Sequence, residues 1–398
     1  MARRKLIGAL LLGCVATGGA AAHAQSLDSF KVTRPGTVLV DHAARLAELE
    51  QIGPAAQKLC SVTEPKVAAR IDPVPELEGR AGYGGNDRRA TPFDWAVIVH
   101  GADAFAGSPA GLEKFMALST TWARAKAMEI LEDDVAGSNT AVVFGLKRTL
   151  ATLIPNWALV RADPQVTADD RELVDAWIGR LVTLADVNTG GMTRAQRVVD
   201  CPANQDTSNC NNHRYLRDTV NVMWGALAGD DRRFRKGVER VRVALRQMRA
   251  DGSLPLETRR GARALWYQNY ALGMLTTIAE VAARQGYDLY AMDADGRTLH
   301  KGVTFLIDGI ADPRIVHGYA EANVAPGPGG HDWREQDLRF TEERGRWHHM
   351  AWTEAYSARF PDHPNTVRLR RLLPGLAEDR PLATRTTGGN ASCFFLRR

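Results

Sequence analysis

Apolar residues recur at helical spacing in one segment after another, and this pattern restricts the fold more than any other feature of the chain. In one such segment Leu112, Phe115, Leu118 and Trp122 follow one another every three or four residues. No window of comparable length alternates apolar and polar residues with period two. Helices are therefore expected over residues 42–59, 111–132, 140–160, 169–185, 211–228, 231–249, 261–285, 296–310, 345–360 and 365–373.

A long series of amphipathic helices joined by short polar loops is typical of antiparallel helix pairs. Such pairs either curl into an α/α barrel, or toroid, or stack into an α-solenoid. Because no fixed-period repeat is visible, the solenoid is disfavoured. We expect an all-α, single-domain α/α toroid over residues 25–398. Within it residues 25–100 look mostly irregular, residues 80–92 form a glycine-rich, lid-like loop, and residues 323–343 form a second irregular loop.

The first 24 residues have the features of a cleaved signal peptide. A basic Arg3-Arg4-Lys5 start precedes a short apolar run, and Ala22-His23-Ala24 matches a cleavage site. The run is too short to span a bilayer. We therefore expect an exported protein, periplasmic or secreted, without membrane insertion. Removing three basic residues from 51 leaves 48 against 46 acidic ones, a balance too even for a nucleic-acid-binding protein.

Four cysteines remain after the targeting segment, and an even number in an exported chain indicates disulfides. Cys201 and Cys210 would close a short loop, and Cys60 and Cys393 would then join the two ends of the chain. Four free thiols are the alternative. Zinc is disfavoured because no Cys-x-x-Cys or matching histidine pair accompanies them.

Two stretches combine polar residues that are suited to chemistry rather than to a core. Asn211-Asn212-His213 stands where a helical pattern begins, just after Cys210. Arg260, Arg263, Tyr267 and Tyr270 fall at i, i+3, i+7 and i+10, which would place them on one stripe of one helix. The alternative for this stripe is a solvated face with extended arginines and half-buried tyrosines.

These residue types suit the removal of a proton next to a carboxylate. Arginine and asparagine can bind and neutralise the carboxylate, and histidine and tyrosine can take and give protons. In a polymer of uronic acids the C5 proton is of this kind, and its removal lets the C4–O bond break by β-elimination. A glycosidase usually needs two carboxyl groups in a cleft, and no such pair stands out.

At these positions the chain resembles alginate lyases with an α/α toroid fold, the poly(β-D-mannuronate) lyase type. Residues 211–215 resemble the signature NNHxYW, with Leu216 in place of its tryptophan. Residues 251–270 resemble DGxLPxE…RxxRALxYHNY, and residues 351–356 resemble AWLEPY. Residues 88–91, with the glycines before them, resemble the lid motif KYxGSDxARAT. The resemblance extends from about residue 80 to 360.

The resemblance implies a polysaccharide lyase that needs no metal or other cofactor. Asn212 and Arg260 would neutralise the C5 carboxylate, and Tyr267 would protonate the leaving glycosidic oxygen. Either Tyr267 or His213 would be the base. Mannuronate-rich alginate is the expected substrate. Since the lid motif departs from the family pattern, polyglucuronate is the alternative substrate. If the chain is not an enzyme, the alternative is a non-catalytic polysaccharide-binding protein.

Further residues are candidates for holding the polymer. Aromatic faces stack on sugar rings, and basic groups attract carboxylates. Arg80 and Tyr83 lie at or next to the positions of the lysine and tyrosine in the lid motif. The predicted substrate-binding residues are Arg80, Tyr83, Trp122, Tyr215, Arg263, Tyr270, His348 and Trp352. For Trp122 core packing is an equal alternative, and for His348 a core or surface position. Lys147 is expected on an exposed basic face.

Overall fold

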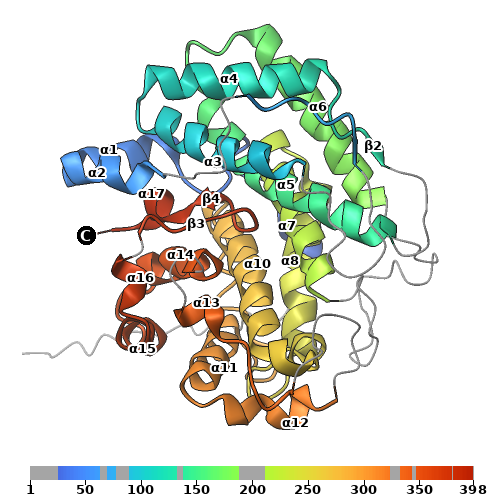
Figure 1. Cartoon of the computed structure of the whole chain (residues 1–398), viewed down its shortest axis with the longest axis vertical. Helices are drawn as coiled ribbons and strands as arrows, with labels where there is room; N and C mark the ends of the chain where they lie inside the picture. Colours follow the sequence, from blue (N-terminus) through green and yellow to red (C-terminus); the bar gives the residue numbers. More distant parts are fainter. Residues whose placement is uncertain are drawn as a thin grey trace, which may run out of the picture.

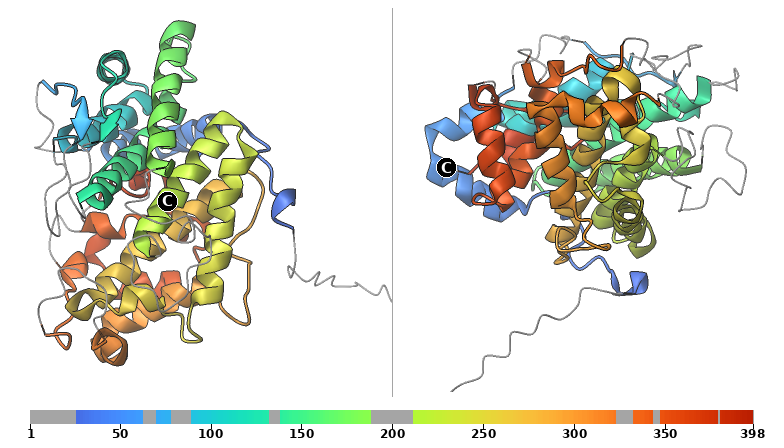
Figure 2. Two further views of the ribbon diagram at one scale, coloured as in Figure 1. Left: turned by 90° about the vertical axis from the view of Figure 1, so that its right-hand side faces the viewer. Right: turned by 90° about the horizontal axis from the view of Figure 1, so that it is seen from below.

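The structure is a computed structural model that describes residues 26–62, 70–77, 89–131, 138–187, 211–322, 332–342, 347–378 and 380–397. The predicted targeting segment, most of the lid-like loop and residues 323–331 lie outside this part of the chain. Figures 1 and 2 show a molecule built almost wholly from helices, with two very short sheets.

Among the described residues, eight helices of thirteen residues or more form the body of the fold. They are α3 (Thr91–Phe105), α4 (Pro109–Arg124), α5 (Ser138–Val160), α6 (Ala168–Val187), α7 (Asn212–Ala228), α8 (Asp231–Gln247), α10 (Ala264–Arg284) and α11 (Leu299–Ala311).

Shorter helices complete the two ends and the connections. They are α1 (His42–Ile52), α2 (Pro54–Cys60), α9 (Pro255–Thr258), α12 (His317–Ala320), α13 (Arg339–Glu342), α14 (Trp352–Arg359), α15 (Pro364–Leu372), α16 (Gly375–Glu378) and α17 (Ala391–Phe395). Single 3₁₀ turns are η1 (Leu27–Ser29), η3 (Gly261–Arg263), η4 (Pro313–Val316) and η5 (Trp347–Met350).

Two-residue strands pair segments that lie far apart in the sequence or close a turn. The strand β1 (Glu76–Leu77) lies parallel to β2 (Ile130–Leu131), with Glu76 opposite Ile130. The strand β3 (Ala383–Thr384) lies antiparallel to β4 (Gly389–Asn390), with Ala383 opposite Asn390. These ladders fasten loops to the helical body and form no layer of their own.

The helices pack as pairs, and the long helix α10 contacts α7, α8, α11 and α14. The pairs α3 with α4 and α7 with α8 make the most extensive contacts, and α5 joins them by packing on both α3 and α7. In Figure 1 α10 lies in the middle of the molecule, between α7 and α8 on one side and α14 on the other. Leu265, Leu272, Leu275 and Ile278 on α10 are fully buried.

Glycines allow α7 and α8 to approach each other closely. A Cβ atom on Gly225 of α7 would lie 2.4 Å from the backbone nitrogen of Phe234, and one on Gly237 of α8 would lie 2.4 Å from Cβ of Val222. Only glycine fits at such contacts, because real Cβ atoms do not approach other atoms this closely. The C-terminal half of α7 is therefore closely packed against the first half of α8.

Four expectations about local structure are wrong in detail. The helix expected over residues 111–132 ends at Arg124, and the one expected over residues 345–360 is divided into η5 and α14. The helix expected over residues 42–59 is divided into α1 and α2, because Gly53 adopts a left-handed φ of 68° and Pro54 follows it. Residues 91–100 are not irregular but belong to α3. Its sequence has no polar stripe because the helix is buried on most sides, so amphipathic periodicity could not reveal it.

The disulfide between Cys60 and Cys393 is confirmed and joins α2 to α17 across a sequence separation of 333 residues. Cys201 and Cys210, the other predicted pair, lie outside the described residues. Hydrogen bonds reinforce the disulfide, since Asn390 Nδ2, just before α17, donates to the carbonyls of Leu59 and Cys60. The C-terminal segment is therefore held to the N-terminal helices both covalently and through hydrogen bonds.

Replacing Cys60 and Cys393 together by alanine is expected to lower the free energy of unfolding by about 2–4 kcal/mol, because the bridge restricts a very long loop in the unfolded chain. Urea unfolding of the two proteins measures this difference. Equal stability of the two proteins would contradict the prediction.

Candidate active site

The start of α7 presents Asn212 and His213 as its first two residues. Asn211 caps the helix, and its side-chain oxygen accepts a hydrogen bond of 3.1 Å from the backbone N–H of His213. Asparagine is among the best residues at this position because it satisfies an N–H group that the helix leaves unpaired. The cap therefore fixes the backbone from which the side chains of Asn212 and His213 extend.

A buried carboxylate holds Asn212 in place. Glu257 on α9 accepts a hydrogen bond of 2.7 Å from the backbone N–H of Asn212 and one of 2.9 Å from its side-chain Nδ2. Asn212 is only 1% exposed, and Glu257 is fully buried. The carboxylate thus sets the rotation of the carboxamide and leaves the second Nδ2 hydrogen for another partner.

Burial raises the pKa of Glu257 from 4.5 to about 7, against the opposing effects of the Arg260 charge and the two hydrogen bonds from Asn212. A folded-state pKa above the unfolded value means that folding binds a proton between these two pH values. The stabilisation linked to this proton is fully present below pH 4.5 and is lost as the pH rises through 7.

A Glu257→Gln variant should lack this pH dependence. The free energy of unfolding of the parent chain, relative to the variant, is expected to fall by up to about 3 kcal/mol between pH 4.5 and 8, since one pKa unit corresponds to about 1.4 kcal/mol. Urea unfolding across that range measures the difference. The exposed Glu113→Gln on α4 serves as the control. A difference that stays constant with pH would contradict the assignment.

Arg260 and Tyr267 lie against each other at the start of α10. The Arg260 guanidinium carbon is 3.8 Å from the centroid of the Tyr267 ring, a close cation–π contact. The expected single-helix stripe is wrong, because α10 begins at Ala264 and both Arg260 and Arg263 precede it. Gly261 has a left-handed φ of 57°, and this turn brings Arg260 back over the ring.

His213 is a half-buried neutral imidazole close to these groups. Its ring centroid lies 4.1 Å from that of Phe144 on α5. Burial, with the positive charges of Lys147 and Arg260 nearby, lowers the pKa of His213 to about 3. Within the described residues Nδ1 is buried without a hydrogen-bond partner. The imidazole is therefore neutral at pH values well above 3 and can accept a proton, and its lowered pKa makes it a weaker base than a free histidine.

Lys147 lies in the interior, contrary to the expected exposed face. Its exposed fraction is 5%, and burial, together with the charges of Arg217 and Arg214, lowers its pKa to about 7, although Asp218 and Asp186 oppose the shift. These residues form a buried charge network where α5, α6, α7 and α8 meet. Asp218 is its centre, since Arg240 Nε donates to it at 2.8 Å and Arg217 Nε at 2.9 Å.

Arg263 and Tyr270, the other members of the predicted stripe, lie beside the site. Arg263 Nε is 3.5 Å from Asp337 Oδ2, and its guanidinium carbon is 5.7 Å from the Trp266 ring. The Tyr270 ring is 6.4 Å from that of Phe144, the residue that packs on His213. Both side chains remain partly exposed. The structure therefore brings Asn212, His213, Arg260 and Tyr267 together, with Arg263 and Tyr270 at the margin.

His348 and Trp352 differ in their access to a substrate. The His348 ring is partly exposed and lies 4.0 Å from that of His349. Trp352 is buried, and its indole N–H donates to Asn269 Oδ1 at 2.8 Å. Asn269 Nδ2 in turn donates to the carbonyl of His349. The prediction that Trp352 stacks on a sugar is therefore wrong, and this residue fastens η5 and α14 to α10.

Two other predicted contacts are wrong because the side chains belong to the core. Trp122 is fully buried, stacks on Phe93 at 3.9 Å and donates its indole N–H to the carbonyl of Ile71. Tyr215 is buried as well, and burial raises the pKa of its hydroxyl. Arg80 and Tyr83, predicted from the lid motif, lie outside the described residues.

Sequence reasoning missed the supporting residues Glu257, Lys147 and Phe144. Glu257 is the last residue of Asp251-Gly252-Ser253-Leu254-Pro255-Leu256-Glu257, a position that the resemblance itself marks. An acidic residue at a fixed position beside catalytic groups is the available signal. Lys147 and Phe144 carry no such signal, because their approach to α7 depends on the packing of α5.

In the part of the chain that the structure describes, no group of three or more histidine, cysteine, aspartate or glutamate side chains is arranged to hold a metal ion. The described helices also include none with the length and apolar character needed to cross a bilayer.

Comparisons with known proteins show the family of the chain. Residues 104–316 match the family model described as alginate lyase, so the chain belongs to the alginate lyase family and is a polysaccharide lyase. The alginate lyase of Pseudomonas syringae pv. syringae strain B728a is 27% identical over 294 residues, which cover 73% of this chain and 67% of that protein.

Solved structures share the fold over nearly the whole chain. A histidine-to-alanine variant of alginate lyase A1-III, complexed with a tetrasaccharide, is 25% identical and superposes with a TM-score of 0.72 over 94% of this chain and 99% of that one. Alginate lyase A1-III from Sphingomonas species A1 superposes with a TM-score of 0.73 at 24% identity. The predicted α/α toroid is confirmed.

Proposed function

We propose that this polysaccharide lyase cleaves mannuronate-rich alginate by β-elimination and leaves a 4,5-unsaturated uronate at the new non-reducing end. The observation that carries the proposal is the assembly of Asn212, His213, Arg260 and Tyr267. These groups lie at the starts of α7 and α10. Glu257 holds the amide of Asn212, the guanidinium of Arg260 stacks on the Tyr267 ring, and the imidazole of His213 is neutral. The relatives and solved structures that the chain resembles are alginate lyases, which supports alginate as the substrate.

The first requirement of the reaction is to make the C5 proton acidic. The free Nδ2 hydrogen of Asn212 and the guanidinium of Arg260 bind the C5 carboxylate and neutralise its charge. Neutralisation stabilises the negative charge that develops when C5 loses its proton. Fixed donors of this kind favour the transition state because they do not have to reorient during the reaction.

The second requirement is a base for the C5 proton and an acid for the leaving oxygen. Tyr267 donates its hydroxyl proton to the glycosidic oxygen as the C4–O bond breaks. In mannuronate the C5 proton and the leaving group lie on the same side of the ring, so Tyr267 can also serve as the base. For a residue of the opposite C5 configuration, the neutral His213 is the base.

The product provides the test, because its C4=C5 double bond absorbs in the near ultraviolet. The purified chain is incubated with polymannuronate, polyguluronate and polyglucuronate, and the absorbance is followed over time. The proposal predicts the fastest rise on polymannuronate. A faster rise on polyglucuronate would change the substrate but not the reaction. No rise on any of the three would leave only a polysaccharide-binding role.

We also propose that the chain is exported and works in an oxidising compartment, with the periplasm as the first candidate. The basic and apolar start of the sequence and the disulfide between Cys60 and Cys393 support this proposal, since such bridges are rare in the cytosol. Fractionation of expressing cells, with mass determination of the mature N-terminus, tests it.

A further inference from the structure

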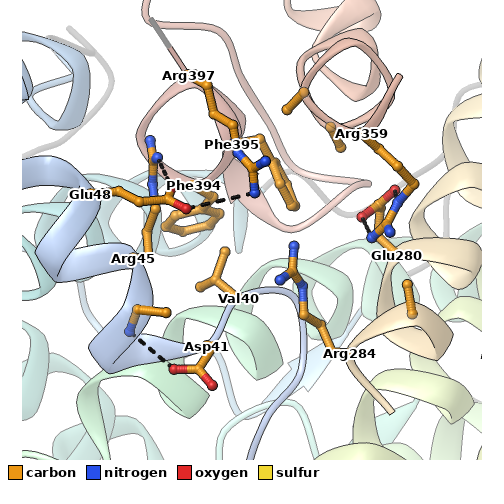
Figure 3. A pocket seen from close by; sticks show the side chains of 14 residues that line it. Val40, Asp41, Arg45, Glu48, Glu280, Arg284, Arg359, Phe394, Phe395 and Arg397 are labelled. Carbon is orange, nitrogen blue, oxygen red and sulfur yellow. Dashed lines mark hydrogen bonds and ion pairs between the residues drawn. The ribbon is translucent and has the colours of Figure 1, made fainter. Parts of the chain in front are cut away.

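A pocket of about 220 Å³ lies at the other end of α10 from the candidate active site. Figure 3 shows side chains from four parts of the chain around it: α1 and the residues before it, the last turn of α10, α14, and the C-terminal segment. Tyr267 and Arg284 are 17 positions apart on one helix, so the two sites are separated by about 25 Å. The pocket shares no residue with the candidate active site.

Four arginines face this pocket, and three of them are already paired. Arg359 donates two hydrogen bonds to Glu280, from Nε at 2.8 Å and from Nη2 at 2.6 Å. Arg45 donates from Nη1 to Glu48 at 2.7 Å and also binds two backbone carbonyls of the C-terminal segment. Arg397 Nη2 lies 3.6 Å from Glu48.

The carboxylates of the pocket are engaged as well. Glu280 accepts a third hydrogen bond from the hydroxyl of Tyr290. Glu48 lies between Arg45 and Arg397, as Figure 3 shows. Asp41 caps α1 by accepting from the backbone N–H of Ala44. These acidic groups are thus occupied by partners within the fold.

Arg284 is the fourth arginine, and the described carboxylates of the pocket make no hydrogen bond to it. Figure 3 shows its side chain pointing into the pocket, between Val40 and the Arg359–Glu280 pair. Its Nε is buried and has no hydrogen-bond partner among the described residues. Burial lowers the pKa of Arg284, although the charges of Glu280 and Glu48 oppose this shift. Burying a guanidinium without a hydrogen bond at Nε is costly, and a bound anion would reduce that cost.

We propose that this pocket is a binding site for a small oxyanion, a carboxylate or a phosphate carried on a body no larger than a monosaccharide. Arg284 supplies the fork that suits such a group, and Arg397 adds positive charge from the opposite wall. The volume corresponds to about seven water molecules, which is more than one anion needs and less than an oligosaccharide needs. The apolar side chains of Val40, Phe394 and Phe395 bound the remaining space.

Isothermal titration calorimetry at low ionic strength tests the proposal with three ligands: sodium D-glucuronate, inorganic phosphate and D-glucose. Glucose is the neutral match of glucuronate and is expected not to bind. Heat with glucuronate alone identifies a uronate site, and heat with both anions identifies a general oxyanion site. An Arg284→Gln variant should bind at least about tenfold more weakly, because one charge-assisted pair is lost. An Arg314→Gln variant, altered at an exposed arginine, should bind as the parent does.

Glucuronate can also enter the catalytic cleft, and an Arg260→Gln variant separates the two sites. Binding that persists in Arg260→Gln and weakens in Arg284→Gln supports the proposal. Binding that disappears in Arg260→Gln and persists in Arg284→Gln overturns it, as does the absence of heat with either anion. Lyase activity on polymannuronate should be unchanged in Arg284→Gln, so failure of this proposal is distinguishable from failure of the proposed function.

Discussion

A Tyr267→Phe variant is expected to lower kcat on polymannuronate by about 10²- to 10⁴-fold, the range for loss of a group that transfers protons in the transition state. The phenylalanine ring keeps the contact with Arg260, so the fold and the carboxylate-binding residues remain in place. The initial rate of product absorbance, at saturating polymer, measures the loss. The change should appear in kcat, because the missing hydroxyl acts on the reaction and contributes little to binding.

Tyr270→Phe is the matched control for this variant. The same atom is removed one helical turn further along α10, where the ring lies near that of Phe144. Its kcat should stay within about threefold of the parent value, the effect of a group that does not transfer protons. If Tyr270→Phe lost activity and Tyr267→Phe kept it, the proton donor would be Tyr270 and the roles of the two tyrosines would be exchanged.

An Arg260→Gln variant is expected to lower kcat/KM by about 10²- to 10³-fold, the usual effect of removing one fixed donor to a developing negative charge. Glutamine keeps a hydrogen-bond donor but not the charge, and the C5 proton becomes less acidic without it. Because Arg260 is buried, circular dichroism and a melting curve must first show that the variant is folded.

Arg263→Gln provides the comparison at the neighbouring arginine. This side chain lies beside Asp337 and remains partly exposed. If Arg263 binds the carboxylate of a neighbouring sugar, the variant loses this contact. Its KM should then rise by a few fold and its kcat should stay nearly unchanged, since an exposed ion pair contributes little. Similar large losses in both variants would mean that the pair acts as one cationic patch, and the specific role of Arg260 would be refuted.

The helical architecture could be predicted because most helices have one apolar face, and α5, α6 and α7 begin within two residues of their expected starts. The exceptions have physical causes. The helix α3 escaped prediction because burial on most sides removes the polar stripe on which periodicity depends. The positive φ of Gly53 divides a pattern that looks continuous in the sequence.

The catalytic candidates could be predicted by residue type, but their arrangement could not. Regular spacing suggested that Arg260 and Tyr267 share a helix, whereas their contact depends on a left-handed turn at Gly261. Trp122, Tyr215 and Trp352 have the residue types of a sugar-binding surface and are nevertheless buried. Aromatic residues serve cores and binding sites equally well, so only the packing of the folded chain distinguishes the two uses.

The hydrogen bonds from Asn212 to Glu257 have a consequence for how the enzyme meets its polymer. The carboxamide is already oriented in the free protein, so no rotamer of this residue has to be frozen when the substrate arrives. Preorganisation of this kind shifts the cost of ordering from binding to folding. We therefore expect Asn212 and Glu257 to superpose closely between free and substrate-bound crystals, with any induced fit confined to other parts of the cleft.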